Sequence, residues 1–273
     1  MNRLIKETLP VVLENERGRA EVLTYGARVI SYKPVGGEEV LFTPRDMSRA
    51  DERFVHGGIP VCWPWFGRYG GIGTALHGFI RSCEWRVEEV EQSCLVLGLI
   101  SSEATRRIWP FDFRLRYVIS VGECLSLRLT SENMSDRPFL LTQGFHPYFL
   151  VNDAEQVVVR GLANDLEVHA GIDGRRGCND AHRYEIDRGE GKEKVALEVC
   201  GENNIVVWNP GPSCCTCTVE SNLEADDWRR FVCVEPIVGP REGALTVEPG
   251  MITTFGLNVW VDESGDDKRE NAR

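Results

Sequence analysis

Two titratable side chains stand in stretches that are otherwise apolar or aromatic, an arrangement suited to proton transfer. His146 occurs in Thr-Gln-Gly-Phe-His-Pro-Tyr-Phe, just beyond an expected strand. Partial desolvation favours the neutral imidazole and suits it to proton exchange near neutral pH. Two interpretations stay open: a general acid or base, or a core histidine that is hydrogen-bonded to the backbone.

Glu235 ends the apolar run Phe-Val-Cys-Val and precedes Pro236, which cannot donate to a strand ladder. A carboxylate at the end of a buried strand is unfavourable unless it is paired or hydrogen-bonded. Burial also raises its pKa toward that of a useful general base. Glu235 is therefore a candidate catalytic base, and a structural salt bridge is the alternative.

The segment from Phe54 to Arg81 combines seven glycines and two prolines with several large aromatic rings. Because glycine and proline exclude a regular helix or strand, we expect a shaped loop that packs on the core or lines a cavity. Four of its side chains suit sugar hydroxyls or an anion: His56, Arg68, His77 and Arg81. A loop packed only for stability is the alternative.

The elements that must hold these residues are strands, because apolar residues recur at every second position. From Phe111 to Val121 the odd-numbered residues are apolar, and the alternation resumes at Leu125 after Gly122, which predicts a hairpin. Similar runs between Gly, Pro, Asn and Asp predict an all-β sandwich or barrel. The further predicted strands are Ala20–Leu23, Arg28–Lys33, Glu39–Phe42, Glu84–Glu91, Cys94–Ser101, Phe139–Thr142, Gln156–Arg160, Ile205–Asn209, Thr216–Glu220, Phe231–Glu235 and Thr253–Val261.

Only two segments favour short helices, Ser102–Ile108 and Glu224–Arg230. Residues 163–194 are polar and rich in Gly and Asp, so we expect a long excursion with one or two strands. We find no internal repeat and no low-complexity linker. Residues 1–273 are therefore interpreted as a single domain, with residues 262–273 as a polar tail that frays.

Charge and composition exclude several classes of partner. A formal net charge of −11 argues against nucleic acid, because phosphate backbones attract an excess of Lys and Arg. The chain has no transmembrane-length apolar run and no signal-peptide segment, so we expect no membrane association and a cytoplasmic protein. Of the ten cysteines, only Cys214, Cys215 and Cys217 cluster, without a Cys-x-x-Cys pair. We interpret the cysteines as reduced thiols and expect no metal.

Five motifs follow one another along the chain. They are His-Gly-Gly-Ile-Pro-Val-Cys-Trp-Pro-Trp-Phe-Gly from His56, then His77–Arg81, His146–Phe149, Trp208–Gly211 and Phe231–Glu235. From about residue 26 to residue 259 the chain thereby resembles the glucose-6-phosphate 1-epimerase group of the galactose-mutarotase-like superfamily. No single motif is decisive, but five in register are specific.

The resemblance implies a large two-layered antiparallel β-sandwich and the interconversion of α and β sugar anomers without metal or cofactor. By the family pattern, Glu235 takes the proton of the C1 hydroxyl and His146 protonates the ring oxygen. His77 matches a sugar-contacting histidine, and Arg81 matches an arginine that contacts phosphate. Trp208, at a strand end, suits a sugar ring or a tight turn. We expect a sugar or sugar-phosphate ligand and a monomer or weak dimer.

The sequence departs from the family pattern at His56, where the family usually has a second phosphate-binding arginine. A guanidinium binds phosphate through two donors and is always charged, so its loss favours unphosphorylated sugars as the alternative substrates. Arg53 or Arg68 would have to compensate. The mid-chain acidic residue of the family has two candidates, Asp165 and Glu167. A catalytically silent sugar-binding domain is the other alternative.

Overall fold

The computed structural model describes residues 9–45, 55–69, 75–177, 181–202, 204–212, 222–239 and 243–262, with the backbone alone at 175–177 and 262. The predicted strand Thr216–Glu220, Arg53, the Cys214, Cys215 and Cys217 cluster and residues 263–273 of the expected tail lie outside the described residues.

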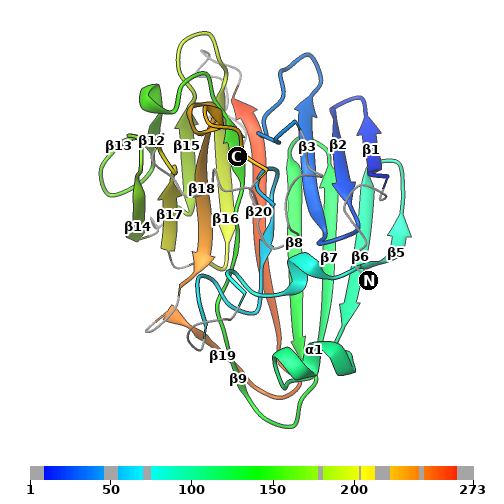
Figure 1. Cartoon of the computed structure of the whole chain (residues 1–273). Coiled ribbons are helices and arrows are strands. Elements are labelled where there is room, and N and C mark those ends of the chain that lie inside the picture. Colours follow the sequence, from blue (N-terminus) through cyan, green and yellow to red (C-terminus); the bar gives the residue numbers. More distant parts are fainter. Residues whose placement is uncertain are drawn as a thin grey trace.

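The described strands form two facing layers (Figure 1). A nine-stranded antiparallel sheet makes one layer, and a six-stranded and a three-stranded sheet make the other. In spatial order, the first sheet contains β13 (Leu166–Glu167), β12 (Val158–Arg160), β15 (Arg183–Asp187), β16 (Lys194–Cys200), β20 (Ile252–Asp262), β8 (Leu125–Asn133), β7 (Phe113–Val121), β6 (Cys94–Ile100) and β5 (Arg86–Val90).

The six-stranded sheet carries Glu235 and Trp208, and His146 directly follows one of its strands. Its order is β14 (Asp173–Gly177), β17 (Asn204–Trp208), β18 (Phe231–Val238), β10 (Gln143–Phe145) and β4 (Val61–Cys62), and β11 (Tyr148–Leu150) also pairs with β18. The three-stranded sheet contains β1 (Val11–Asn15), β2 (Gly18–Leu23) and β3 (Arg28–Pro34), and a two-stranded sheet contains β19 (Leu245–Val247) and β9 (Phe139–Leu141). The prediction of a large antiparallel β-sandwich is confirmed.

The hairpin of β7 and β8 shows why the sequence folds this way. Alternate residues of both strands are buried, and the register pairs Val121 with Leu125 across the predicted turn at Gly122. The buried side chains join one core with residues of the facing layer, including Ala20 and Val234. Since the side-chain period of a strand is two, one apolar face suffices to fix this hairpin against the opposite layer.

The strand β18 is buried on both faces. Val232, Val234 and Val238 point into the core between the layers. On the opposite face, Phe231 and Cys233 pack in a cluster with Tyr148, and Ile237 packs in another cluster with Cys62, Phe66 and Val206. Glu235 belongs to this second face by its position in the strand, so its carboxyl group lies between two apolar clusters.

Two predicted features of the chain differ in the structure. The segment Glu39–Phe42 is not a strand, and only a single bridge joins Leu41 to Phe149. Val40 and Phe42 donate backbone hydrogen bonds to two different segments, at the carbonyls of Tyr32 and Tyr148, so no continuous ladder forms. The carboxylate of Glu39 also accepts hydrogen bonds from the backbone N–H groups of Tyr32, Val40 and Leu41. Residues 163–194 contain three strands, β13, β14 and β15, rather than one or two. Their sequence patterns are too short to predict each strand, and hydrogen bonds to neighbouring strands such as β12, β16 and β17 stabilise them.

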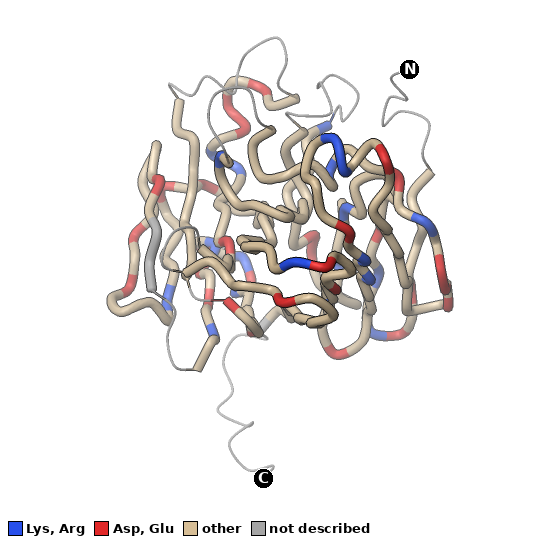
Figure 2. Tube along the Cα trace, turned by 90° about the horizontal axis from the view of Figure 1, so that it is seen from below, with Lys and Arg blue, Asp and Glu red and all other residues tan. Residues whose placement is uncertain are grey.

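Helix is scarce, as predicted. α1 (Glu103–Ile108) starts at a capping box in which Ser102 and Thr105 bond each other's backbone N–H groups. The other predicted helix is reduced to a 3₁₀ turn at Asp227–Arg230, and further 3₁₀ turns occur at Ile80–Ser82 and Ala154–Gln156. Within the described residues, no helix is long and apolar enough to cross a membrane. Acidic positions occur on all sides of the trace with basic ones between them (Figure 2).

Gly58 lets its own segment approach the backbone of β3 closely, and this contact positions the loop that carries His56. It has a φ of +66°, and a Cβ there would overlap the carbonyl oxygen of Val29. Gly36 has a similar φ of +70°, but its Cβ would meet open space. Gly58→Ala should therefore lower the free energy of unfolding by more than Gly36→Ala, which should cost about 1–2 kcal/mol for the left-handed backbone alone. Urea denaturation of the two variants measures the difference, and equal losses would contradict the close-approach argument.

Candidate active site

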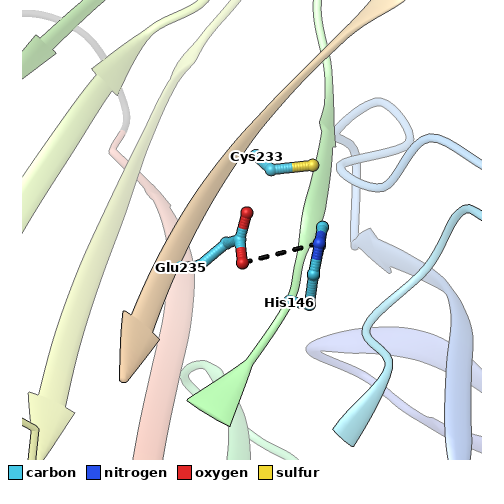
Figure 3. A group of neighbouring side chains, drawn as sticks. All are labelled: His146, Cys233 and Glu235. Carbon is cyan, nitrogen blue, oxygen red and sulfur yellow. Dashed lines mark ion pairs between the residues drawn. The ribbon is translucent and has the colours of Figure 1, made fainter. Parts of the chain in front are cut away.

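A histidine and a glutamate converge on the outer face of the six-stranded sheet. His146 directly follows β10, whose residues Gln143 and Gly144 pair with β18, and Glu235 lies on β18 itself. The distance from His146 Nε2 to Glu235 Oε2 is 3.5 Å (Figure 3). Both residues are buried, with 9% and 1% of their surface exposed. The structure therefore brings together the two residues that the sequence singles out for proton transfer.

Burial shifts the two pKa values in opposite directions. The pKa of Glu235 is raised well above 4.5 by desolvation and, secondarily, by the carboxylate of Asp173. The pKa of His146 is lowered well below 6.5 by desolvation and then by the nearby His77 and Arg81. Because each shift favours the uncharged form, the pair holds one proton between its two members over a wide pH range, mainly on the carboxyl group.

Aromatic rings surround His146. The ring of Tyr148 stacks on the imidazole with centroids 4.9 Å apart, and the ring of Trp208 lies edge-on at 5.9 Å. Desolvation raises the pKa of Tyr148 well above 10, so its hydroxyl stays protonated. These rings exclude water from one side of the pair and offer apolar faces of the kind that sugar rings pack against.

His77 stands beside His146 with its ring centroid 5.4 Å away. Its Nδ1 accepts a hydrogen bond of 3.2 Å from the backbone N–H of Gly67. Desolvation, followed by the charge of Arg81, lowers the pKa of His77 to about 3. A neutral imidazole that accepts at Nδ1 carries its proton on Nε2, so His77 is a hydrogen-bond donor at that atom.

His56 is tied to Asn222, a residue that the sequence analysis did not single out. The backbone N–H of His56 donates to Asn222 Oδ1 over 2.9 Å, His56 Nδ1 lies 3.2 Å from the same oxygen, and Asn222 Nδ2 donates back to the His56 carbonyl. Since an amide oxygen only accepts, Nδ1 carries a proton. Nε2 of His56 can then donate to an anion only when the imidazole is charged.

Two arginines bring positive charge to this region. Arg81 lies in the 3₁₀ turn Ile80–Ser82, and its Nη2 donates to the Leu76 carbonyl over 2.7 Å. Arg28, which the sequence analysis treated only as part of a strand, is buried, and its Nη1 donates to the Val55 carbonyl over 3.0 Å. Desolvation and then the charge of Arg81 lower the pKa of Arg28 to about 10, so the Arg28 guanidinium group is charged at neutral pH.

Other sequence candidates lie elsewhere. Arg68 is exposed, and the described contacts do not tie it to the pair. Asp165 and Glu167 are exposed residues at the edge of the nine-stranded sheet, and Asp165 forms an ion pair of 2.6 Å with Arg160. The placement of Asp165 and Glu167 argues against a role in this site, because His146 and Glu235 lie at the other sheet.

Asp173 is the acidic residue that the structure places near the pair. It opens β14 and stands in register with Trp208, which in turn stands in register with Cys233. Its charge contributes to the raised pKa of Glu235. The sequence gives little sign of this position, since Asp-Gly is first of all a turn signal.

Cys233 completes a group of three possible metal ligands with the pair. Its Sγ, a nitrogen of His146 and a carboxylate oxygen of Glu235 all lie within 4.8 Å of one another (Figure 3). Cys233 is fully buried, and desolvation raises the pKa of its thiol well above 9. Among the described residues, this is the group whose ligand atoms converge closely enough to hold an ion.

A two-layered β-sandwich with a buried His–Glu pair beneath aromatic rings defines a protein of the mutarotase-like class. The model of the family described as aldose 1-epimerase matches residues 10–172. A Salmonella typhimurium protein whose name provisionally assigns it as a glucose-6-phosphate 1-epimerase is 30% identical over 83% of this chain and 82% of its own. The chain therefore belongs to the aldose 1-epimerase family and is an epimerase.

Further relatives agree with this assignment. An Escherichia coli K12 protein with the same provisional name is 30% identical over 90% of this chain and 88% of its own. The crystal structure of a Salmonella typhimurium protein, provisionally described as a mutarotase, superposes with a TM-score of 0.81 at 27% identity, covering 92% of this chain and 90% of that one. A galactose mutarotase related enzyme of Lactobacillus acidophilus, 17% identical over 94% and 99% of the two chains, has the same fold with a TM-score of 0.75.

The neutral state of folded His77 makes stability depend on pH. Between pH 6.5 and about 3, the unfolded chain binds a proton at this residue that the folded chain does not. This contribution to stability is complete above pH 6.5 and is lost as the pH falls, by at most about 1.4 kcal/mol per unit. The His77→Asn variant should therefore lose less stability than the parent between pH 7 and pH 4.5.

Urea denaturation at a series of pH values measures this difference. The matched control is His169→Asn, which removes an exposed imidazole outside the site. Parallel pH profiles for the parent and His77→Asn would contradict a neutral His77 in the folded protein.

Proposed function

We propose that this protein interconverts the α and β anomers of a hexose 6-phosphate, with Glu235 as the general base and His146 as the general acid. The observation that carries the proposal is the 3.5 Å approach of two buried, oppositely shifted titratable groups on one face of the sheet. Membership of the aldose 1-epimerase family supports the reaction type.

Glu235 and His146 lie side by side on one face of the sheet. This arrangement suits the chemistry, because the two oxygens that exchange protons are bonded to the same carbon, C1. A base and an acid that converge can reach both oxygens, while a pair separated by a whole sugar ring would have to reach around it.

The reaction needs one proton on the pair. When it moves from the Glu235 carboxyl group to His146, the carboxylate becomes a base and the imidazolium an acid. Glu235 takes the proton of the C1 hydroxyl, the bond between C1 and the ring oxygen breaks, and the ring oxygen takes the proton of His146. Rotation about C1–C2 and the reverse transfers give the other anomer and restore both residues, so no electrons are gained or lost.

The neighbouring residues orient the sugar. The Nε2–H of His77 is a donor beside His146, so it is placed to bind a sugar oxygen near the reacting carbon. Trp208 and Tyr148 supply apolar walls. Asp173, across the register from Trp208, is an acceptor for sugar hydroxyl groups at the other side of the ring.

Arg81 is the proposed phosphate ligand, and the buried charge of Arg28 adds to the positive potential there. The provisional names of the Salmonella typhimurium and Escherichia coli relatives, glucose-6-phosphate 1-epimerase, support a phosphorylated substrate. His56 favours the alternative of an unphosphorylated aldose, because its neutral form presents an acceptor rather than a donor at Nε2. Anomerisation rates of glucose 6-phosphate, glucose and galactose decide between the two, and equal or faster rates on the free sugars would exclude the phosphate assignment.

The catalytic roles are tested by Glu235→Gln and His146→Gln. Each variant should lower kcat for anomerisation by about 10²- to 10⁴-fold, because each removes one proton-transfer group. Polarimetry starting from a single pure anomer measures the rate. The control is Glu202→Gln, which alters another His–Glu pair beside the nine-stranded sheet, in which the buried Glu202 lies 2.6 Å from a partly exposed His182. Retained activity in Glu235→Gln, or equal losses in the control, would remove Glu235 from the role of base.

The phosphate assignment is tested by His56→Arg. A permanently charged guanidinium that reaches the phosphate should strengthen the binding of glucose 6-phosphate by roughly 1.5–3 kcal/mol. This gain should appear as a lower KM for glucose 6-phosphate. KM for glucose should stay unchanged, so the free sugar is the internal control. An unchanged KM for glucose 6-phosphate would show that position 56 does not face the phosphate.

A further inference from the structure

Cys233 takes no part in the proposed proton transfers, yet its thiol lies against both reactive groups. Cys233 and Glu235 are two residues apart on β18, so their side chains share the face of the sheet that His146 covers (Figure 3). Burial of the thiol is complete, and it packs with Tyr148 and Phe231. The site therefore contains a sulfur, a nitrogen and an oxygen ligand side by side.

One separation already matches an edge of a tetrahedral metal site, and the sulfur lies close to the third corner. Zn–N and Zn–S bonds of about 2.0 and 2.3 Å place neighbouring ligand atoms roughly 3.3–3.8 Å apart. The 3.5 Å between His146 Nε2 and Glu235 Oε2 already corresponds to one edge of such a tetrahedron. Since all three ligand atoms lie within 4.8 Å of one another, the sulfur needs a shift of only about 1 Å to complete three corners.

Hydrogen bonding leaves the oxygen ligand atom available. Glu235 Oε2 is buried and has no hydrogen-bond partner among the described residues. His146 Nδ1 is likewise buried and unpartnered there, so the described structure does not assign the ring proton to one nitrogen. A buried polar atom without a partner is unfavourable, and a ligand that bonds to it relieves that cost.

We propose that His146, Cys233 and Glu235 form a latent site for a soft divalent cation such as Zn²⁺ or Cd²⁺. Thiolate, imidazole and carboxylate are the ligand types that zinc uses, and three protein ligands leave the fourth position open to water or a sugar hydroxyl. A bound ion would coordinate His146 and Glu235, the two residues assigned to proton transfer. The ion therefore inhibits anomerisation, a consequence that rests on the proposed function, whereas binding itself does not.

The neighbourhood makes this ion a reversible inhibitor rather than a resident cofactor. On binding, a metal–sulfur bond forms, and the thiol proton and any proton on Glu235 pass to the solvent, with no change of oxidation state. Displacing the proton of a fully buried thiol is unfavourable, and the positive charge of Arg81 nearby repels a cation. Asp173 is the acidic group that opposes this repulsion from the side of Glu235.

The binding test uses Cd²⁺, whose bond to a thiolate gives an ultraviolet charge-transfer band. Because Cys214, Cys215 and Cys217 cluster in the sequence, they are first changed to serine in the full-length chain. In this background Cd²⁺ should produce the band, Cys233→Ser should abolish it, and Cys62→Ser should retain it. Cys62 is the matched control, because it is an equally buried cysteine of the same sheet whose sulfur lies outside the group of three.

The inhibition test uses the same variants with Zn²⁺ in the anomerisation assay. Zn²⁺ should inhibit the background enzyme competitively with the sugar, and excess EDTA should restore the rate. Each variant is compared with its own uninhibited rate, and the inhibition constant should rise about tenfold or more in Cys233→Ser but not in Cys62→Ser. Equal inhibition of both would overturn the inhibitory part of the proposal.

Metal binding and anomerisation are measured separately, so the metal site and the proposed function can fail independently. A Cd²⁺ band that depends on Cys233 in a protein without anomerase activity would support the metal site and refute the proposed function. If Cys233→Ser does not fold, Glu235→Gln should still weaken Cd²⁺ binding about tenfold or more, and crystals soaked in Cd²⁺ should show anomalous density between the three residues. Density elsewhere, or a band that persists in Cys233→Ser, would overturn the site.

Discussion

The desolvation of one carboxyl group, that of Glu235, is the constraint on which the site depends. β18 is buried on both faces, so the side chain of Glu235 has apolar clusters on either side along the strand. An isolated buried carboxylate is strongly unfavourable, and this cost raises the pKa of Glu235. The imidazole of His146, 3.5 Å away, is the partner of the carboxyl group. The same burial that disfavours the charge makes the group a base of useful strength once the proton moves to His146.

The surrounding elements hold His146 and Glu235 together and exclude water from them. β10 pairs with β18 on one side and with β4 on the other, which fixes the backbone from which His146 projects. Two contacts hold the segment before β4 in place. Arg28 donates a hydrogen bond to the Val55 carbonyl, and Gly58 lets the chain approach β3 closely. The loop that carries His56 and His77 is thus shaped by buried polar contacts, although its sequence is rich in glycine.

Features that depend on one strand or one local motif could be predicted from the sequence, and features that depend on distant partners could not. The alternation from Phe113 to Val121 is sufficient to predict its hairpin, and the isolation of His146 and Glu235 in apolar runs singles out the two residues that the fold brings to 3.5 Å. Asn222 escapes notice because only the fold brings it to His56, and Asp173 because its Asp-Gly sequence is typical of a turn. The Glu39–Phe42 segment has the pattern of a strand, but its backbone hydrogen bonds go to two different segments and to the Glu39 carboxylate rather than to one ladder.

The presence of cysteine rather than serine beside Glu235 follows from the same electrostatics. A serine hydroxyl is a stronger hydrogen-bond donor than a thiol, and a bond from such a donor to the carboxylate would stabilise the charged form and lower the pKa of Glu235. A thiol of nearly the same size is a weak donor, so it fills the space and leaves the base undiminished. The thiol is also a soft metal ligand, however. Under the proposed roles, the thiol that preserves the basicity of Glu235 therefore also opens the pair to cations that prefer sulfur, so that proton transfer and metal binding would compete for the same buried atoms.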